Sequence, residues 1–307
     1  MRILIVGAGA VGGYFGARLA AAGRDVTFLV RAGRAEQLRR TGLVVKSPHG
    51  DLAMQPKLLL ASEIVEPFDL IVLSTKAYSL DAAIQDFAPA VGAQTMILPL
   101  LNGMRHFDIL VARFGESAIL GGSTRIVSDL SPEGHVLQFG PWHDMVFGER
   151  DKSVTPGIEA LGATLQGCGF PTMLSPDILA SLWMKWTMLS SLAGTTCLLR
   201  GTIGEIEAAA GGVETVRAII AESAAISAAN GYPQKPDFLE QHTARMTEPG
   251  SALTASMFRD LQKGAPVEAD HILGDFLARG RAHGVAAPLL EAAYVQLSIY
   301  SASLSPK

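Results

Sequence analysis

The stretch Arg2-Ile3-Leu4-Ile5-Val6-Gly7-Ala8-Gly9-Ala10-Val11-Gly12 decides the fold, because an apolar run leads directly into a glycine-rich turn. The run predicts a buried β-strand. The alanine-rich residues 13–22, which end at Gly23, predict the helix that follows the turn. A strand, a G-x-G-x-x-G turn and a helix in this order are typical of the first unit of a dinucleotide-binding α/β domain.

Each glycine of this turn has an expected task in holding a pyrophosphate. Gly7 permits a tight turn, Gly9 lets the backbone approach the phosphates, and Gly12 lets the helix pack on the strand. The N–H groups and positive dipole end of the helix then face the anion. The predicted cofactor loop is Gly7, Ala8, Gly9, Ala10, Val11 and Gly12. The alternative is a glycine turn in an unrelated α/β protein, which the flanking strand and helix disfavour.

The second predicted strand, residues 25–31, indicates which dinucleotide is bound. An NAD-selective site normally ends this strand with a carboxylate for the ribose 2′-hydroxyl, but here Arg31 holds that place. A guanidinium pairs with a 2′-phosphate, so the sequence favours NADP(H). Arg34 is expected to add a second contact. The alternative is that both arginines are solvated surface charges.

Composition narrows the class of partner and the compartment. The chain has 307 residues, 49% of them hydrophobic, and a net charge of −4 without basic clusters, which indicates a small-molecule partner and neither nucleic acid nor membrane. The two cysteines, Cys168 and Cys197, have no metal-ligand spacing, so no metal site is expected. No secretory signal is apparent, and we expect a cytoplasmic protein.

The predicted elements divide the chain into an α/β half and a helical half. Residues 1–175 are expected to form a Rossmann-type doubly wound sheet, and residues 176–307 an all-helical substrate and catalytic domain. After the first two strands, further strands are expected at 43–47, 52–55, 58–60, 70–74, 95–100, 118–123, 134–139, 145–148 and 172–174, the 134–139 and 145–148 strands as an antiparallel addition. Helices are expected at 82–88, 159–168, 177–199, 213–230, 237–246, 252–263, 267–283 and 289–303.

No flexible linker separates the two halves. Packed domains with a ligand cleft between them are therefore expected. The apolar helical half is also compatible with a homodimer. Lys185 interrupts the most apolar stretch, residues 179–199, which favours a buried helix over a membrane span.

Two short motifs follow buried strands in the first half. Lys76 lies in Ser74-Thr75-Lys76-Ala77, and Asn102 lies in Leu101-Asn102-Gly103-Met104. The carboxyl ends of parallel strands form the ligand crevice of an open α/β sheet, so both side chains are candidates to contact cofactor and substrate. The alternatives are a solvated helix start for Lys76 and an ordinary Asn-Gly turn for Asn102.

Lys185 is the candidate proton donor, because it lies on a predicted helix with apolar neighbours in both directions. Burial lowers the pKa of a lysine, and such a lysine can protonate a carbonyl oxygen as hydride reaches the carbon. The alternative is a lysine whose stem covers apolar surface while its ammonium group stays in water.

Three further polar residues lie in the helical half. Ser256 and Asp260 are four residues apart and so share a helix face, and Glu268 is expected to open the next helix and point back to the same cleft. The alternative for the two carboxylates is a solvated face and a helix-start charge. His271 and His283 are expected at the surface or at helix ends.

Together these motifs resemble those of the ketopantoate reductase family, NADPH-dependent enzymes that reduce 2-dehydropantoate to pantoate on the way to coenzyme A. The resemblance covers almost the whole chain and rests on the glycine loop, Arg31, Lys76-Ala77, Asn102-Gly103-Met104, Trp183-Met184-Lys185, and the segment from Ser256-Met257 through Asp260 to Glu268. It implies that Lys185 donates the proton and that Glu268 supports catalysis. It also implies that Lys76 and Asn102 contact cofactor and substrate, and that Ser256 binds substrate with Asp260 nearby.

The chain departs from the family at two positions. The family usually carries an asparagine four residues after the lysine, where this chain has Leu189, and often a glutamine where it has Leu101. The absence of a buried hydrogen bond costs about 1 to 3 kcal/mol, enough to redirect specificity. Ser190, Thr187 or Thr195 are candidates to take over the role of that asparagine.

Two other functions stay open. The first is a related NADPH-dependent reductase of another small 2-oxo acid, which Leu189 favours. The second is a non-catalytic NADP(H)-binding sensor, which would need neither Lys185 nor Glu268.

Overall fold

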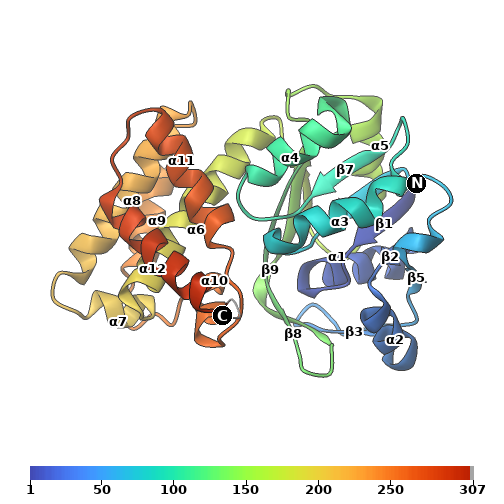
Figure 1. The fold of residues 1–307 in the computed structure, drawn as a ribbon, viewed down its shortest axis with the longest axis horizontal. Helices are drawn as coiled ribbons and strands as arrows, with labels where there is room; N and C mark the ends of the chain where they lie inside the picture. The colour runs from blue at the N-terminus through green and yellow to red at the C-terminus, as the bar shows by residue number, and fades with distance from the viewer. Residues whose placement is uncertain (305–307) are drawn as a thin grey trace. The chain divides into compact units, whose positions relative to one another are not determined.

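A computed structural model describes residues 1–304 of the chain, which divide into two compact units (Figure 1). The first unit comprises Met1–Leu101 and His106–Leu179. The second comprises Asn102–Arg105 and the chain from Ala180 onward. The short segment Asn102–Arg105 therefore packs with the second unit although it lies within the first half of the sequence.

The first unit contains a five-stranded parallel sheet with the order β5-β2-β1-β6-β7. Its strands are β1 (Arg2–Val6), β2 (Asp25–Leu29), β5 (Lys57–Leu59), β6 (Leu70–Leu73) and β7 (Met96–Pro99). The chain turns to one side of β1 for β2 and to the other for β6, so the topological switch point lies at β1. This arrangement confirms the predicted Rossmann-type fold.

Four helices connect or follow these strands: α1 (Ala10–Ala21), α2 (Ala32–Thr41), α3 (Leu80–Phe87) and α4 (Arg105–Phe114). Residues 3–6 and 70–73 are almost completely buried, as strands covered on both faces require.

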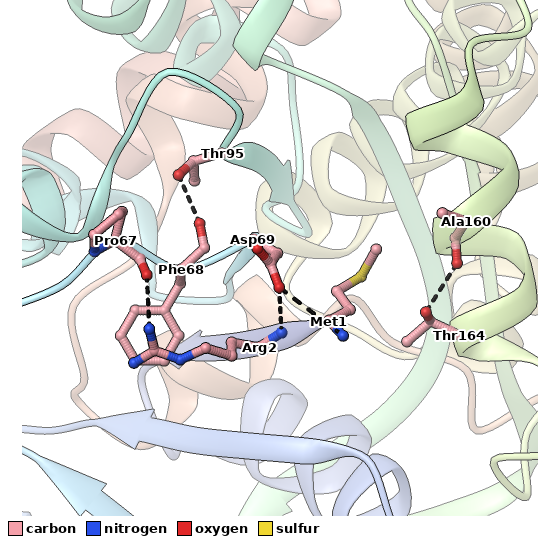
Figure 2. A network of polar contacts seen from close by, with 8 residues as sticks. All are labelled: Met1, Arg2, Pro67, Phe68, Asp69, Thr95, Ala160 and Thr164. Carbon is pink, nitrogen blue, oxygen red and sulfur yellow. Dashed lines mark hydrogen bonds and ion pairs between the residues drawn. The ribbon is translucent and has the colours of Figure 1, made fainter.

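Side chains at the amino ends of the central strands fix their relative position (Figure 2). The backbone N–H of Arg2 donates to Oδ2 of Asp69 at 2.6 Å, and Nη1 of Arg2 donates to the carbonyl of Pro67 at 3.2 Å. The hydroxyl of Thr95 donates to the carbonyl of Phe68 at 2.6 Å. The first two contacts join β1 to the residues before β6, and the third joins the residues before β6 and β7. Because these strands pair in parallel, their carboxyl ends lie at one edge of the sheet.

The remaining strands form a second, separate sheet, which corrects the expectation of a single doubly wound sheet. Its order is β10-β9-β3-β4, and β8 pairs antiparallel with β9. The strands are β3 (Leu43–Lys46), β4 (Leu52–Met54), β8 (Gly121–Leu130), β9 (Val136–Gly148) and β10 (Thr172–Leu174), and α5 (Pro156–Leu165) lies between the last two.

The two strands expected at 134–139 and 145–148 are one continuous strand, β9. Gly140 and Pro141 lie in the gap between the two expected strands, where they interrupt the apolar pattern. A register shift between Ile126 and Val127 of β8 absorbs the irregularity, so pairing continues along the hairpin.

From Ala180 to Leu304 the second unit contains helices and no strand, as predicted. Its helices are α6 (Ile178–Leu199), α7 (Ile203–Glu207), α8 (Gly212–Ala229), α9 (Pro236–Met246), α10 (Ser256–Gln262), α11 (Asp275–Ala282) and α12 (Pro288–Leu304). α7 was not predicted, although Thr202 and Glu205 form a capping box at its start.

Two predicted helices begin later than expected. The helix expected at 252–263 starts at Ser256, and the helix expected at 267–283 starts with a π turn, Asp270–Gly274, that leads into α11. Glu268 therefore precedes the helical residues. Among residues 1–304, no helix combines the length and the apolarity that crossing a bilayer requires.

Candidate functional site

The glycine loop between β1 and α1 has the geometry that its sequence predicts. Gly7 adopts a φ of +95°, which a residue with a side chain rarely adopts. A Cβ at Gly12 would meet the carbonyl oxygen of Gly7 and Oγ of Ser74, so only glycine allows α1 to pack this closely. A Cβ at Gly9 would meet nothing within 4 Å, so the space beside this residue is open.

The loop fits a pyrophosphate in a second respect. Gly9 is the N-cap of α1 and provides no side-chain hydrogen bond to the first turn. The N–H groups at a helix start need partners, and an anion is a favourable one. Of the other predicted loop residues, Ala8 is buried, while Ala10 and Val11 begin α1 and are half-buried.

Ser74 ties the glycine loop to the neighbouring strand. Its hydroxyl lies 3.1 Å from the carbonyl oxygen of Val6 and 3.2 Å from that of Gly7, and it donates to them. No role was predicted for Ser74, although it belongs to the motif that contains Lys76. A small hydroxyl residue directly after the strand beside β1 is the signal that would have suggested it.

Arg31 and Arg34 have different surroundings. Arg31 is exposed and occupies the N-cap position of α2, two residues after β2. Arg34 lies within α2, and its Nε and Nη2 donate to the carbonyl of Ala8. Its Nη2 also donates to the carbonyl of Gly134, and its Nη1 to Gln37.

The expectation that Arg34 adds a second phosphate contact is therefore corrected. Four of its five N–H donors bind backbone carbonyls or Gln37, and the turn between β8 and β9 lies against this side of α2. Burial lowers the pKa of Arg34.

Lys76 and Asn102 follow the adjacent parallel strands β6 and β7, as predicted. Lys76 is exposed and precedes a short 3₁₀ turn, Ala77–Ser79. Asn102 is half-buried. The next residue, Gly103, has a φ of +78°, and a Cβ there would lie 2.6 Å from the carbonyl oxygen of His271. The Asn102-Gly103 turn therefore packs directly on His271.

Lys185 lies on α6 and is half-buried. Its neighbours Leu182, Trp183 and Trp186 are buried, as the apolar sequence predicts. Leu189, one turn further along α6, is also half-buried.

The three hydroxyl residues considered as substitutes for the family's asparagine are completely buried. The hydroxyl of Thr187 donates to the carbonyl of Trp183 on the same helix, and that of Ser190 to the carbonyl of Ile272. Within residues 1–304, the hydroxyl of Thr195 has no hydrogen-bond partner. The single O–H donors of Thr187 and Ser190 are therefore already used on carbonyl oxygens of the protein.

Ser256 and Asp260 lie on α10, the first exposed and the second half-buried. Glu268 is buried, with 8% of its surface exposed, so it is not a solvated helix-start charge.

The two histidines of this part of the chain differ from each other. His271 was expected at the surface or at a helix end, but it is buried in the π turn. Burial lowers its pKa, Glu268 opposes this shift, and Arg105 adds to it. His283 is exposed at the end of α11, as predicted.

A glycine loop at the central strand of a parallel sheet, followed by a helical unit with Lys185 and buried Glu268, defines the class of Rossmann-type oxidoreductases. Family models confirm this class: residues 3–152 match Ketopantoate reductase PanE/ApbA, and residues 177–301 match its C-terminal domain. The chain belongs to the ketopantoate reductase family.

Relatives with known sequences or structures agree with this assignment. The chain is 37% identical over 302 residues to the uncharacterized oxidoreductase YkpB of Bacillus subtilis, covering 98% of this chain and 99% of that protein. The structure of a 2-dehydropantoate 2-reductase from Geobacter metallireducens is 29% identical, with a TM-score of 0.88 over 97% of this chain and 99% of that one. A D-mandelate dehydrogenase with NADH and anilino(oxo)acetate is 27% identical, with a TM-score of 0.86 over 99% of both chains.

Proposed function

We propose that this protein catalyses the NADPH-dependent reduction of 2-dehydropantoate to pantoate, a step of pantothenate and coenzyme A biosynthesis. The observation that carries the proposal is Lys185, a half-buried ammonium group set among buried apolar side chains of α6. A homodimer and a cytoplasmic location stay predictions.

The first unit supplies the residues for the cofactor. The glycine loop from Gly7 to Gly12 would hold the pyrophosphate, and exposed Arg31 would pair with the 2′-phosphate. Lys76 and Asn102 would contact cofactor or substrate. When bound, NADPH supplies the hydride.

The second unit supplies the proton. As the keto carbon of the substrate gains hydride, its oxygen becomes an alkoxide, and Lys185 would transfer a proton from Nζ to that oxygen. An ammonium group at this oxygen stabilises the transition state more than the ground state. Glu268 would support this step, and Ser256 and Asp260 would bind the substrate.

A second candidate is reduction of a different 2-oxo acid, one with an apolar substituent. Leu189 favours it, because this aliphatic side chain lies one helical turn from Lys185, and the hydroxyls of Thr187 and Ser190 are bonded to interior carbonyls. The similarity to D-mandelate dehydrogenase supports the same alternative. A sensor without activity is disfavoured, because it would need neither Lys185 nor buried Glu268.

The test follows oxidation of NADPH by the purified protein with 2-dehydropantoate, with other 2-oxo acids that include aromatic ones, and with NADH as the alternative cofactor. Saturable turnover that prefers 2-dehydropantoate supports the proposal. Turnover only with another acid supports the second candidate, and tight NADPH binding without turnover supports the sensor.

The role of Lys185 is tested with Lys185→Met beside Lys235→Met, an exposed lysine at the start of α9. We expect Lys185→Met to lower kcat at least about 100-fold while NADPH still binds, as expected for a lost acid catalyst. Near-native turnover in Lys185→Met would exclude it as the proton donor, and Lys235→Met should behave as the wild type.

A further inference from the structure

The π turn Asp270–Gly274 comes directly after the segment that carries Glu268. The backbone N–H of Ile272 donates to the carbonyl of Glu268 at 3.0 Å, so Glu268 is connected to this turn by its own backbone. A π turn is wider than an α-helical turn and changes which backbone groups pair along the helix; such turns are frequent at functional sites.

Two side chains of α6 bind one carbonyl of this turn. Nε1 of Trp186 donates to the carbonyl oxygen of Ile272 at 2.9 Å, and the hydroxyl of Ser190 donates to the same oxygen at 3.3 Å. Trp186 and Ser190 are four residues apart, so they lie on one face of α6, and both are buried. Trp186 directly follows Lys185 in the sequence, so these bonds tie the Lys185 turn of α6 to the segment that follows Glu268.

Two further elements contact the same turn. Gly103 packs on the carbonyl and ring of His271, which brings the Asn102-Gly103 turn to the π turn. The hydroxyl of Tyr294 on α12 donates to Oδ1 of Asp270 at 2.7 Å. The segments that carry Asn102, Lys185 and Glu268 therefore all contact or adjoin the five residues of the π turn, Asp270–Gly274.

We propose that the π turn sets the relative positions of Lys185, Asn102 and Glu268, and that Trp186 and Ser190 are the positioning residues that hold α6 to it. The proposal rests on the proposed function for the roles of those three residues. An N–H and an O–H on one carbonyl use both of its lone pairs, which defines the position of the turn more closely than a single bond would.

The experiment uses Trp186→Phe, Ser190→Ala and the double variant. Trp186→Phe keeps an aromatic ring beside Phe276, whose ring centroid lies 4.8 Å from that of Trp186, but removes the N–H. The matched controls are Trp183→Phe and Ser223→Ala. Trp183 is a buried neighbour in the same aromatic cluster, and buried Ser223 donates to Ile219 within its own helix, α8.

Two measurements are made on each variant. The first is amide hydrogen exchange of residues 266–274. It reports whether the hydrogen bonds from α6 stabilise the π turn, and it needs no known substrate. The second is the dependence of kcat and KM on pH, together with the Kd of NADPH. A misplacement of about 1 Å can lower the rate about 100-fold, so in the double variant we expect kcat to fall about 10- to 100-fold, with a changed pH profile and an unchanged Kd for NADPH.

The outcomes separate this inference from the proposed function. Faster exchange at residues 266–274 in the double variant but not in the controls, with the fall in kcat, supports the inference. Unchanged exchange there, or an equal fall in kcat in the two controls, overturns it. If the wild type reduces none of the acids, the proposed function fails, and the exchange measurement still decides whether Trp186 and Ser190 hold the turn.

Discussion

Arg34 donates two hydrogen bonds to the carbonyl oxygen of Ala8, from Nε at 3.2 Å and from Nη2 at 3.0 Å. Its Nη2 also donates to the carbonyl of Gly134 at 3.0 Å, so one side chain connects the glycine loop to the turn between β8 and β9. Arg31, three residues earlier, is exposed. The two arginines therefore differ in their surroundings: Arg34 binds the glycine loop, whereas Arg31, which we propose to pair with a 2′-phosphate, is exposed.

Substitution of each arginine should reveal this difference in cofactor binding. Hydrogen bonds to charged groups contribute about 1.5 to 3 kcal/mol, or roughly 10- to 100-fold in affinity. We expect Arg31→Ala to weaken the binding of NADPH by this factor and to leave the binding of NADH unchanged. Arg34→Ala should weaken the binding of both cofactors. The Kd of each cofactor, measured by fluorescence titration, is the readout, and Arg39→Ala on the exposed side of α2 is the control. Equal effects of Arg31→Ala on both cofactors would contradict the assignment.

Alanine substitutions at Gly9 and Gly12 should have different effects on stability. A Cβ at Gly12 would clash with backbone at Gly7, so we expect Gly12→Ala to lower the free energy of unfolding by about 1 to 3 kcal/mol or more. A Cβ at Gly9 meets open space, so Gly9→Ala should keep the Tm. It should weaken the binding of NADPH, because the methyl group would fill the space in which we propose that the phosphates lie. Thermal unfolding with and without NADPH measures both effects. An unchanged Tm in Gly12→Ala would contradict this prediction, because it would show that the backbone at Gly7 can move away from α1 at little cost.

Stability should fall at mildly acidic pH because of His242. This buried side chain bonds Oγ of Ser191 through Nε2 at 2.7 Å, and burial, with Arg245 adding to it, lowers its pKa to about 4. An unfolded histidine has a pKa of about 6.5, so between these values the unfolded chain binds a proton that the folded chain does not. The folded state is therefore destabilised by up to roughly 3 kcal/mol as the pH falls from about 6.5 to about 4.

Urea unfolding at several pH values measures this destabilisation. His242→Gln should flatten the profile, and His283→Gln, at an exposed position, should not. The free energy of unfolding of His242→Gln should still depend on pH to some extent, since burial also lowers the pKa of His271. An identical profile in the wild type and in His242→Gln would contradict the prediction.

Both cysteines should resist alkylation in the folded protein. Cys168 and Cys197 are buried, and burial raises the pKa of Cys197 to about 12. The thiolate is the reactive form, so we expect labelling by iodoacetamide only after unfolding in urea. Mass spectrometry of the labelled protein identifies the modified residues. Fast labelling of Cys197 under native conditions would show that α6 opens locally.

The local sequence was sufficient to predict an element wherever the residues that determine it lie within that one segment. The strand Arg2–Val6, the glycine turn and α1 follow from an apolar run and from glycines whose φ or close packing excludes a side chain. Most helices of the second unit were predicted within a few residues, because their apolar periodicity and terminal Gly or Pro are local signals. The same signals predicted that Lys185 lies among buried apolar residues.

The sequence was insufficient where a residue's partner lies far away in the chain. Nothing near Arg34 indicates that it binds carbonyls of Ala8 and Gly134, 26 and 100 residues away. The second sheet was not predicted for the same reason, since β3 pairs with β9 across about 90 residues of chain. The close approach of Gly103 to His271 is of the same kind, because no local pattern connects these two residues.

The sequence by itself thus determined the Rossmann-type core, the helical second half, the family and the candidate residues, because periodicity, glycine positions and motif spacing are properties of contiguous segments. Only the tertiary structure decided the different surroundings of Arg31 and Arg34, the separation into two sheets and the meeting of three segments at the π turn. These features depend on hydrogen bonds and packing between residues distant in sequence, which form only when the chain has folded.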